Sequence, residues 1–89
     1  MLTSPTPGLT TVLGASNVPF QWTAGTGATL YQLNLSAIAP GDSDLYSYKG
    51  SATSTIVPTI PGNGVTVYAR LYSYINKTWQ YNDYVYTEP

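Results

Sequence analysis

The chain reads VTVYARLYSYI over residues 65–75, and its odd-numbered positions in this stretch are apolar except for Ser73. Apolar residues at every second position place one face of a β-strand against a core and the other face toward solvent. We therefore expect the odd-numbered residues to point inward and the Tyr and Arg side chains to lie outside, unless a bulge near Tyr68 shifts the register. Asn76 and Lys77 then predict a tight hairpin into a second strand.

Short strands with turn signals between them continue on both sides of this stretch. Eight Gly and seven Pro residues separate runs rich in Val, Ile, Thr and Tyr, and no helical periodicity is present. This spacing predicts an all-β sandwich or barrel of seven antiparallel strands. The predicted strands cover residues 2–4 continued by 9–13, 18–23, 30–38, 44–49, 54–60, 65–75 and 79–87.

Alternation and proline positions predict how these strands are arranged. Because proline cannot donate to a β-ladder, Pro5, Pro7 and Pro58 predict edge strands. We expect the first strand, 18–23 and 54–60 to form one sheet that faces the other four strands. In the last strand the alternation leaves open which face is inward. The side chains expected to point inward elsewhere are Val18, Phe20, Trp22, Tyr31, Leu33, Leu35 and Ile56.

Size and charge exclude several classes of function. The chain has 89 residues, the length of a single domain (1–89), with three basic and four acidic residues. It therefore lacks the basic surface that nucleic acids require and any polybasic or amphipathic segment for a membrane. With no Cys, it can form neither a disulfide nor a thiolate metal site.

Catalytic residues are also missing, so we expect no enzyme activity and no cofactor. No His is available as a general base, and a small core offers no dry pocket to activate a Lys nucleophile. Asp42 and Asp44 share one turn instead of facing each other across a cleft, as a glycosidase pair would. The same two residues could supply oxygen ligands to Ca²⁺, but without a third acid nearby we favour a solvated turn and expect no metal.

The order of the aromatic landmarks resembles that of fibronectin type III domains. FQW at residues 20–22 is similar to the family's F-x-W, YQL at 31–33 is similar to its next strand, and IPG at 60–62 followed by Tyr68 is similar to its tyrosine corner. The resemblance covers the whole chain. It implies a Greek-key β-sandwich of the fibronectin type III or immunoglobulin-like kind, with Tyr68 bonded back to the backbone near residue 61.

A narrower resemblance is to repeats in large bacterial secreted or surface proteins. It rests on Ser4-Pro5, WTAG at residues 22–25, YARL at 68–71 and WQYNDY at 79–84. This resemblance implies a non-catalytic extracellular spacer or interaction module whose first partners are neighbouring domains of the same chain.

The nine tyrosines are the main indication of a binding surface, because a small core cannot hold so many hydroxyl groups. Three interpretations remain open. The rings could serve only to stabilise cross-strand packing, with Arg70 lying over one of them, or they could contact a protein. They could also stack on a glycan, as in a carbohydrate-binding module attached to a secreted hydrolase. Edge strands in a chain of low charge also leave open a self-assembling fibre subunit. The candidate binding residues are Tyr68, Arg70, Tyr72, Tyr74, Tyr84 and Tyr86.

Overall fold

The stretch VTVYARLYSYI forms the longest strand pair of the protein with the strand that follows it. In the computed structural model, which describes residues 1–89, β6 (Thr66–Ile75) turns at Asn76 and Lys77 into β7 (Thr78–Thr87). The two turn residues have φ values of 50° and 63°, as a type I′ turn requires at both central positions. The predicted hairpin is therefore confirmed, and its strands pair without a register shift, so there is no bulge at Tyr68.

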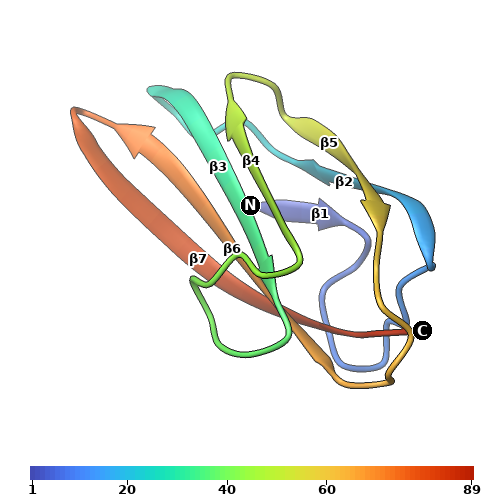
Figure 1. Ribbon diagram of the computed structural model, residues 1–89. Helices are drawn as coiled ribbons and strands as arrows, with labels where there is room; N and C mark the ends of the chain where they lie inside the picture. The colour runs from blue at the N-terminus through green and yellow to red at the C-terminus, as the bar shows by residue number, and fades with distance from the viewer.

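The protein is all-β, and its seven antiparallel strands form two sheets (Figure 1). One sheet has the order β1-β2-β5 and the other β4-β3-β6-β7, which confirms the predicted division of the strands. β1, which Pro5 follows, and β5, which contains Pro58, are edge strands, as predicted. The remaining strands are β1 (Leu2–Ser4), β2 (Ser16–Trp22), β3 (Ala28–Ser36), β4 (Tyr46–Gly50) and β5 (Ser54–Thr59).

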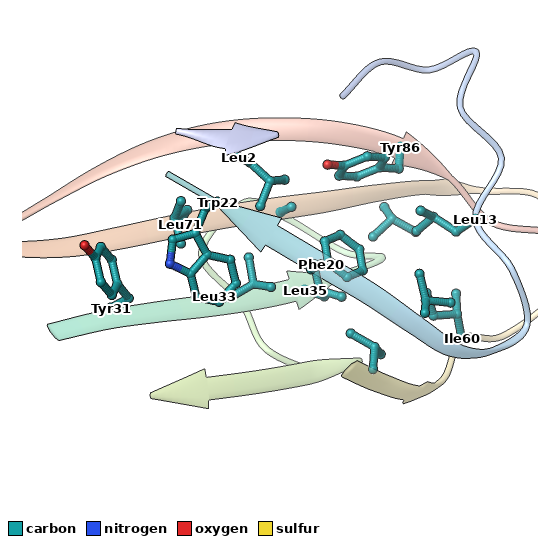
Figure 2. Close-up of a cluster of buried hydrophobic side chains, with 14 residues drawn as sticks. Leu2, Leu13, Phe20, Trp22, Tyr31, Leu33, Leu35, Ile60, Leu71 and Tyr86 are labelled. Carbon is teal, nitrogen blue, oxygen red and sulfur yellow. The ribbon is translucent and has the colours of Figure 1, made fainter. Parts of the chain in front are cut away.

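The core lies between the two sheets and is built around aromatic rings (Figure 2). Phe20 of β2 meets Tyr86 of β7 edge to face, with ring centroids 5.5 Å apart. Trp22 lies between Tyr31 and Tyr48, each with its centroid 6.0 Å away. The predicted inward side chains of β2 and β3 are all buried: Val18, Phe20, Trp22, Tyr31, Leu33 and Leu35.

The prediction for β5 was wrong by one residue. Ile56 is 60% exposed, whereas the neighbouring Val57 is fully buried. The reason is the pairing of β5 with β2, in which Val57 lies directly opposite the buried Val18. Directly opposite residues share a face of a sheet, so Ile56 must point to the other side.

The second half of the predicted first strand was also wrong. Residues 9–13 do not extend β1 but cross to the other sheet, where Val12 forms an isolated parallel bridge with Thr87. The Gly8 N–H donates to the Val85 carbonyl, and the Leu13 N–H donates to the Thr87 carbonyl. This segment thus pairs with the end of β7 and places Leu13 in the core. In this place the segment pairs with backbone groups of Val85 and Thr87 that would otherwise lie unpaired.

Candidate binding face

The outer side chains of the four-stranded sheet lie in rows that the strand register fixes. Tyr74 of β6 lies opposite Trp79 of β7, and Tyr72 lies opposite Tyr81. We call these four rings the aromatic face. Trp79 is 37% exposed and Tyr81 53%, so both present apolar surface to solvent.

An ion pair fixes one side of the aromatic face. The Arg70 Nε donates to Asp83 Oδ1 at 2.7 Å, and a second guanidinium nitrogen donates to Oδ2 at 3.1 Å. Such a bidentate pair is directional as well as charge-assisted. The guanidinium carbon lies 4.0 Å from the centroid of the Tyr81 ring and 6.0 Å from that of Tyr72. Hydrogen bonding to Asp83, and then to Tyr72, raises the pKa of Arg70 further above its already high value, so this cation is permanent.

The rings pack against one another at an angle and do not form a coplanar platform. Tyr72 meets Trp79 edge to face at 6.3 Å and meets Tyr81 at 5.7 Å with a tilt of 58°. Tyr74 lies 5.0 Å from Trp79 with a tilt of 48°. The Lys49 ammonium lies 5.5 Å from the Trp79 ring centroid. Two of the three basic side chains of the protein are therefore placed over rings of this face.

Next to the aromatic face, strands β3 and β4 carry a small network of polar side chains. The Asn34 Oδ1 accepts hydrogen bonds from the Gln32 amide at 3.2 Å and the Ser47 hydroxyl at 2.8 Å. The Asn34 Nδ2 donates to the carbonyl of Gly41 in the β3–β4 loop, which buries Asn34 although it belongs to the outer side of the sheet. Gly41 also lies directly against the Arg70 guanidinium, since a Cβ there would be 2.7 Å from a terminal nitrogen.

The structure brings together four of the six candidate residues predicted from the sequence. Tyr68, Arg70, Tyr72 and Tyr74 share the outer side of β6, because their neighbours Val67, Ala69 and Leu71 are buried on the inner side. Tyr68 therefore points away from the core, and its hydroxyl makes no hydrogen bond to the β5–β6 connection. The tyrosine-corner role that the resemblance implied for Tyr68 is not present.

Tyr84 and Tyr86 lie on the opposite, inner side of the sheet and do not belong to the aromatic face. The Tyr86 ring is fully buried, and its hydroxyl donates to the Pro5 carbonyl at 2.8 Å. Burial, with a smaller contribution from Tyr84, raises the pKa of Tyr86 well above its usual value. The Tyr84 hydroxyl accepts the Leu2 N–H at 3.2 Å. Both phenols therefore fasten the N-terminal segment to β7.

Alternation alone did not identify three residues of this surface: Trp79, Tyr81 and Asp83. The two-residue turn does identify them. It places Ile75 opposite Thr78, and because the register does not shift, each step back along β6 pairs with one step forward along β7. The outward Arg70, Tyr72 and Tyr74 then require Asp83, Tyr81 and Trp79 opposite them.

The acidic turn carries its own hydrogen bonds. Asp44 Oδ2 accepts the Ala37 N–H at 3.2 Å across the β3–β4 loop. The Ser36 hydroxyl is the main cause that lowers the pKa of Asp44, and the Ala37 N–H adds to it. No three His, Cys, Asp or Glu residues gather where they could hold a metal ion.

No protein-family model, curated protein sequence or solved structure matches the chain. The structure has no helix that is long and apolar enough to cross a membrane. The structure also contains no pocket, so a ligand of the aromatic face would lie across an open surface.

Proposed function

We propose that this chain is a non-catalytic module of the fibronectin type III or immunoglobulin-like kind, with Greek-key connections, in a secreted or cell-surface protein. The strand order β1-β2-β5 facing β4-β3-β6-β7 supports the fold, because it is the division that the resemblance implies. The small number of charged residues and the absence of His support a role without catalysis. The module would space or present neighbouring domains and contact a protein partner through the aromatic face.

The observation that carries the binding role is the exposure of Trp79 and Tyr81 beside two further rings. Exposed Trp and Tyr side chains lower the solubility of a protein, and they are enriched where proteins contact one another. Here the bidentate Arg70–Asp83 pair already holds Tyr81 in place. A surface that is rigid before binding loses less side-chain entropy when a partner arrives.

The cations over the rings favour a protein partner over a glycan. Stacking on a sugar needs a free ring face, but the Arg70 guanidinium lies 4.0 Å over Tyr81 and the Lys49 ammonium lies 5.5 Å from Trp79. A sugar on these covered faces would have to displace a cation that is attracted to the ring. A protein surface can instead pack across ring edges and hydrogen-bond the Tyr hydroxyls.

Solvent access to Trp79 tests this proposal. In a Trp22→Phe background, acrylamide quenching of Trp79 is compared between the isolated domain and the full polypeptide encoded by the same open reading frame. We expect at least twofold weaker quenching in the full polypeptide, because a neighbouring domain would cover the aromatic face. Equal quenching in both would contradict a contact with neighbouring domains.

Affinity electrophoresis through a panel of soluble polysaccharides tests the glycan alternative. We expect the wild-type chain and a Tyr72→Ala variant to migrate alike in every gel. Retardation of the wild type that Tyr72→Ala abolishes would replace the proposal with a carbohydrate-binding module.

A further inference from the structure

The outer edge of β7 is unpaired over half of its length. The strand is the last of its sheet, and in Figure 1 no strand lies along its upper half on the side that faces away from β6. Backbone groups along a strand point alternately to its two sides. The Val85 carbonyl and both the N–H and the carbonyl of Thr87 point away from β6, because they bond to Gly8, Thr11 and Leu13. By the same alternation Trp79, Tyr81 and Asp83 direct their N–H and C=O groups outward, where no residue of the protein pairs with them.

The other exposed edges carry features that oppose strand pairing. β1 is three residues long with a register shift, β5 contains Pro58, and β4 carries Lys49. Short strands, bulges, prolines and lysines are the devices that protect sheet edges. The stretch 78–84 of β7 has none of them. Its one charge, Asp83, is neutralised by Arg70 of the same molecule.

We propose that a second copy of this chain pairs with β7 as an antiparallel strand, about a twofold axis at Tyr81. The open stretch lies between the turn at Lys77 and the segment that covers β7 from Val85 onward, so it extends over residues 78–84 and is centred on Tyr81. A twofold pairing needs such a centre. It places Tyr81 opposite the partner's Tyr81 and Trp79 opposite the partner's Asp83. Every outward N–H and C=O group of Trp79, Tyr81 and Asp83 then finds a hydrogen-bond partner.

The side chains are compatible with this register on both faces. On the inner face Gln80 lies opposite the partner's Asn82, and two amides can donate to and accept from each other. On the outer face the two Tyr81 rings become neighbours and extend the aromatic face across the axis. No like charges lie opposite each other, because Asp83 meets the partner's Trp79. The paired stretch is short, so we expect a dissociation constant of about 10⁻⁵–10⁻³ M.

The proposed dimer uses the backbone edge of β7, so it does not depend on the proposed contact through the ring faces. It also differs from a fibre. A twofold interface uses the same edge of both copies and closes on itself, so association ends at the dimer.

Sedimentation equilibrium of the full chain, from about 10 µM to about 2 mM, tests the inference across the expected affinity range. We expect the average mass of the wild type to rise toward that of a dimer and no further. Tyr81→Pro removes the outward N–H without removing a bond to β6 and should weaken association at least tenfold. Tyr81→Lys adds a charge at the axis and should do the same. The matched control Tyr72→Ser changes the aromatic face but not the edge and should stay within twofold of the wild type.

Amide hydrogen exchange of the wild type provides a readout that does not depend on any variant. Raising the concentration should slow exchange at Trp79, Tyr81 and Asp83 at least threefold, while Gln80 and Asn82, whose N–H groups face β6, should not change. A strictly monomeric wild type at the highest concentration would overturn the inference. So would species larger than a dimer, or concentration-dependent protection that does not alternate along β7.

Discussion

Lys77 occupies a backbone conformation that suits glycine better than lysine. Its φ of 63° lies in the left-handed region, and it is the second central residue of the type I′ turn between β6 and β7. We expect Lys77→Gly to stabilise the protein by about 0.5–1 kcal/mol, because relief of this strain exceeds the added entropy of the unfolded chain. Thermal unfolding should show a rise of about 2–8 °C in Tm. Asn76→Gly is the control and should change Tm less, since Asn tolerates this region. A lower Tm for Lys77→Gly would contradict the assignment of the turn.

Trp22 combines large apolar contacts with a buried polar atom that has no partner. Its Nε1 lies in the core without a hydrogen bond, while its rings pack against Tyr31 and Tyr48. An unsatisfied buried N–H costs about 1–3 kcal/mol. Trp22→Phe removes that cost together with part of the packing, so we expect a net loss of less than about 1.5 kcal/mol, against about 3–5 kcal/mol for Trp22→Ala. Urea unfolding measures both variants. Equal losses of unfolding free energy in the two variants would contradict a net cost of the unpaired N–H.

At the scale of elements, the β3–β4 loop and strand β6 are joined through Gly41. This residue has a φ of 91°, and a Cβ there would be 2.7 Å from a terminal nitrogen of Arg70. Gly41→Ala should therefore add backbone strain and also displace the guanidinium from Asp83, with an expected loss of about 2–3 kcal/mol. Chemical denaturation measures this loss.

Gly64→Ala is the matched control for the loop prediction. Gly64 also has a positive φ, 68°, but a Cβ there would meet nothing within 4 Å. It should thus report the backbone strain alone and cost about 1–2 kcal/mol. When Arg70→Ala is added to both variants, Gly41→Ala and Gly64→Ala should lose the same unfolding free energy. A difference that persists without Arg70 would mean that the loop is not held by the guanidinium.

The elements also show how far alternation in the sequence can predict this fold. Clean period-two patterns predicted β2, β3 and β6 with their inward faces, since burial on one side forces such a pattern. The pattern of β5 was ambiguous because Ile56 and Val57 are both apolar, and only pairing with Val18 decides between them. Residues 9–13 were misplaced because their hydrogen-bond partner, the end of β7, is distant in sequence. The faces of β7 were left open, and Tyr84 and Tyr86 were wrongly assigned to the outer side, although the two-residue turn combined with the alternation in β6 requires Trp79 and Tyr81 there.

At the scale of the whole molecule, the residue composition predicts a stability that changes little between about pH 5 and 9. The chain has no His, the side chain that ordinarily titrates in this range. One carboxyl group, Asp44, and one phenol, Tyr86, have shifted pKa values, and both affect stability only outside this pH range. The pKa of Asp44 is lowered, so its contribution is lost only as the pH falls below the unfolded value of about 4. We expect Tm to vary by less than about 3 °C across this plateau.

The alkaline limit of that plateau should depend on Tyr86. Its pKa is raised by burial in the folded protein, so the folded state holds the phenol proton more tightly than the unfolded state does. The resulting stability is complete below the unfolded pKa of about 10 and is lost as the pH rises above that value. Tyr86→Phe cannot ionise, so its Tm should fall less steeply than that of the wild type above pH 10. At neutral pH the same variant should be less stable by about 1 kcal/mol, because the hydrogen bond to the Pro5 carbonyl is lost. Tyr81→Phe, at an exposed ring, should follow the wild-type alkaline profile. If Tyr86→Phe and the wild type fall in parallel above pH 10, another group sets the limit, and burial of the Tyr86 phenol does not determine where the sandwich begins to unfold.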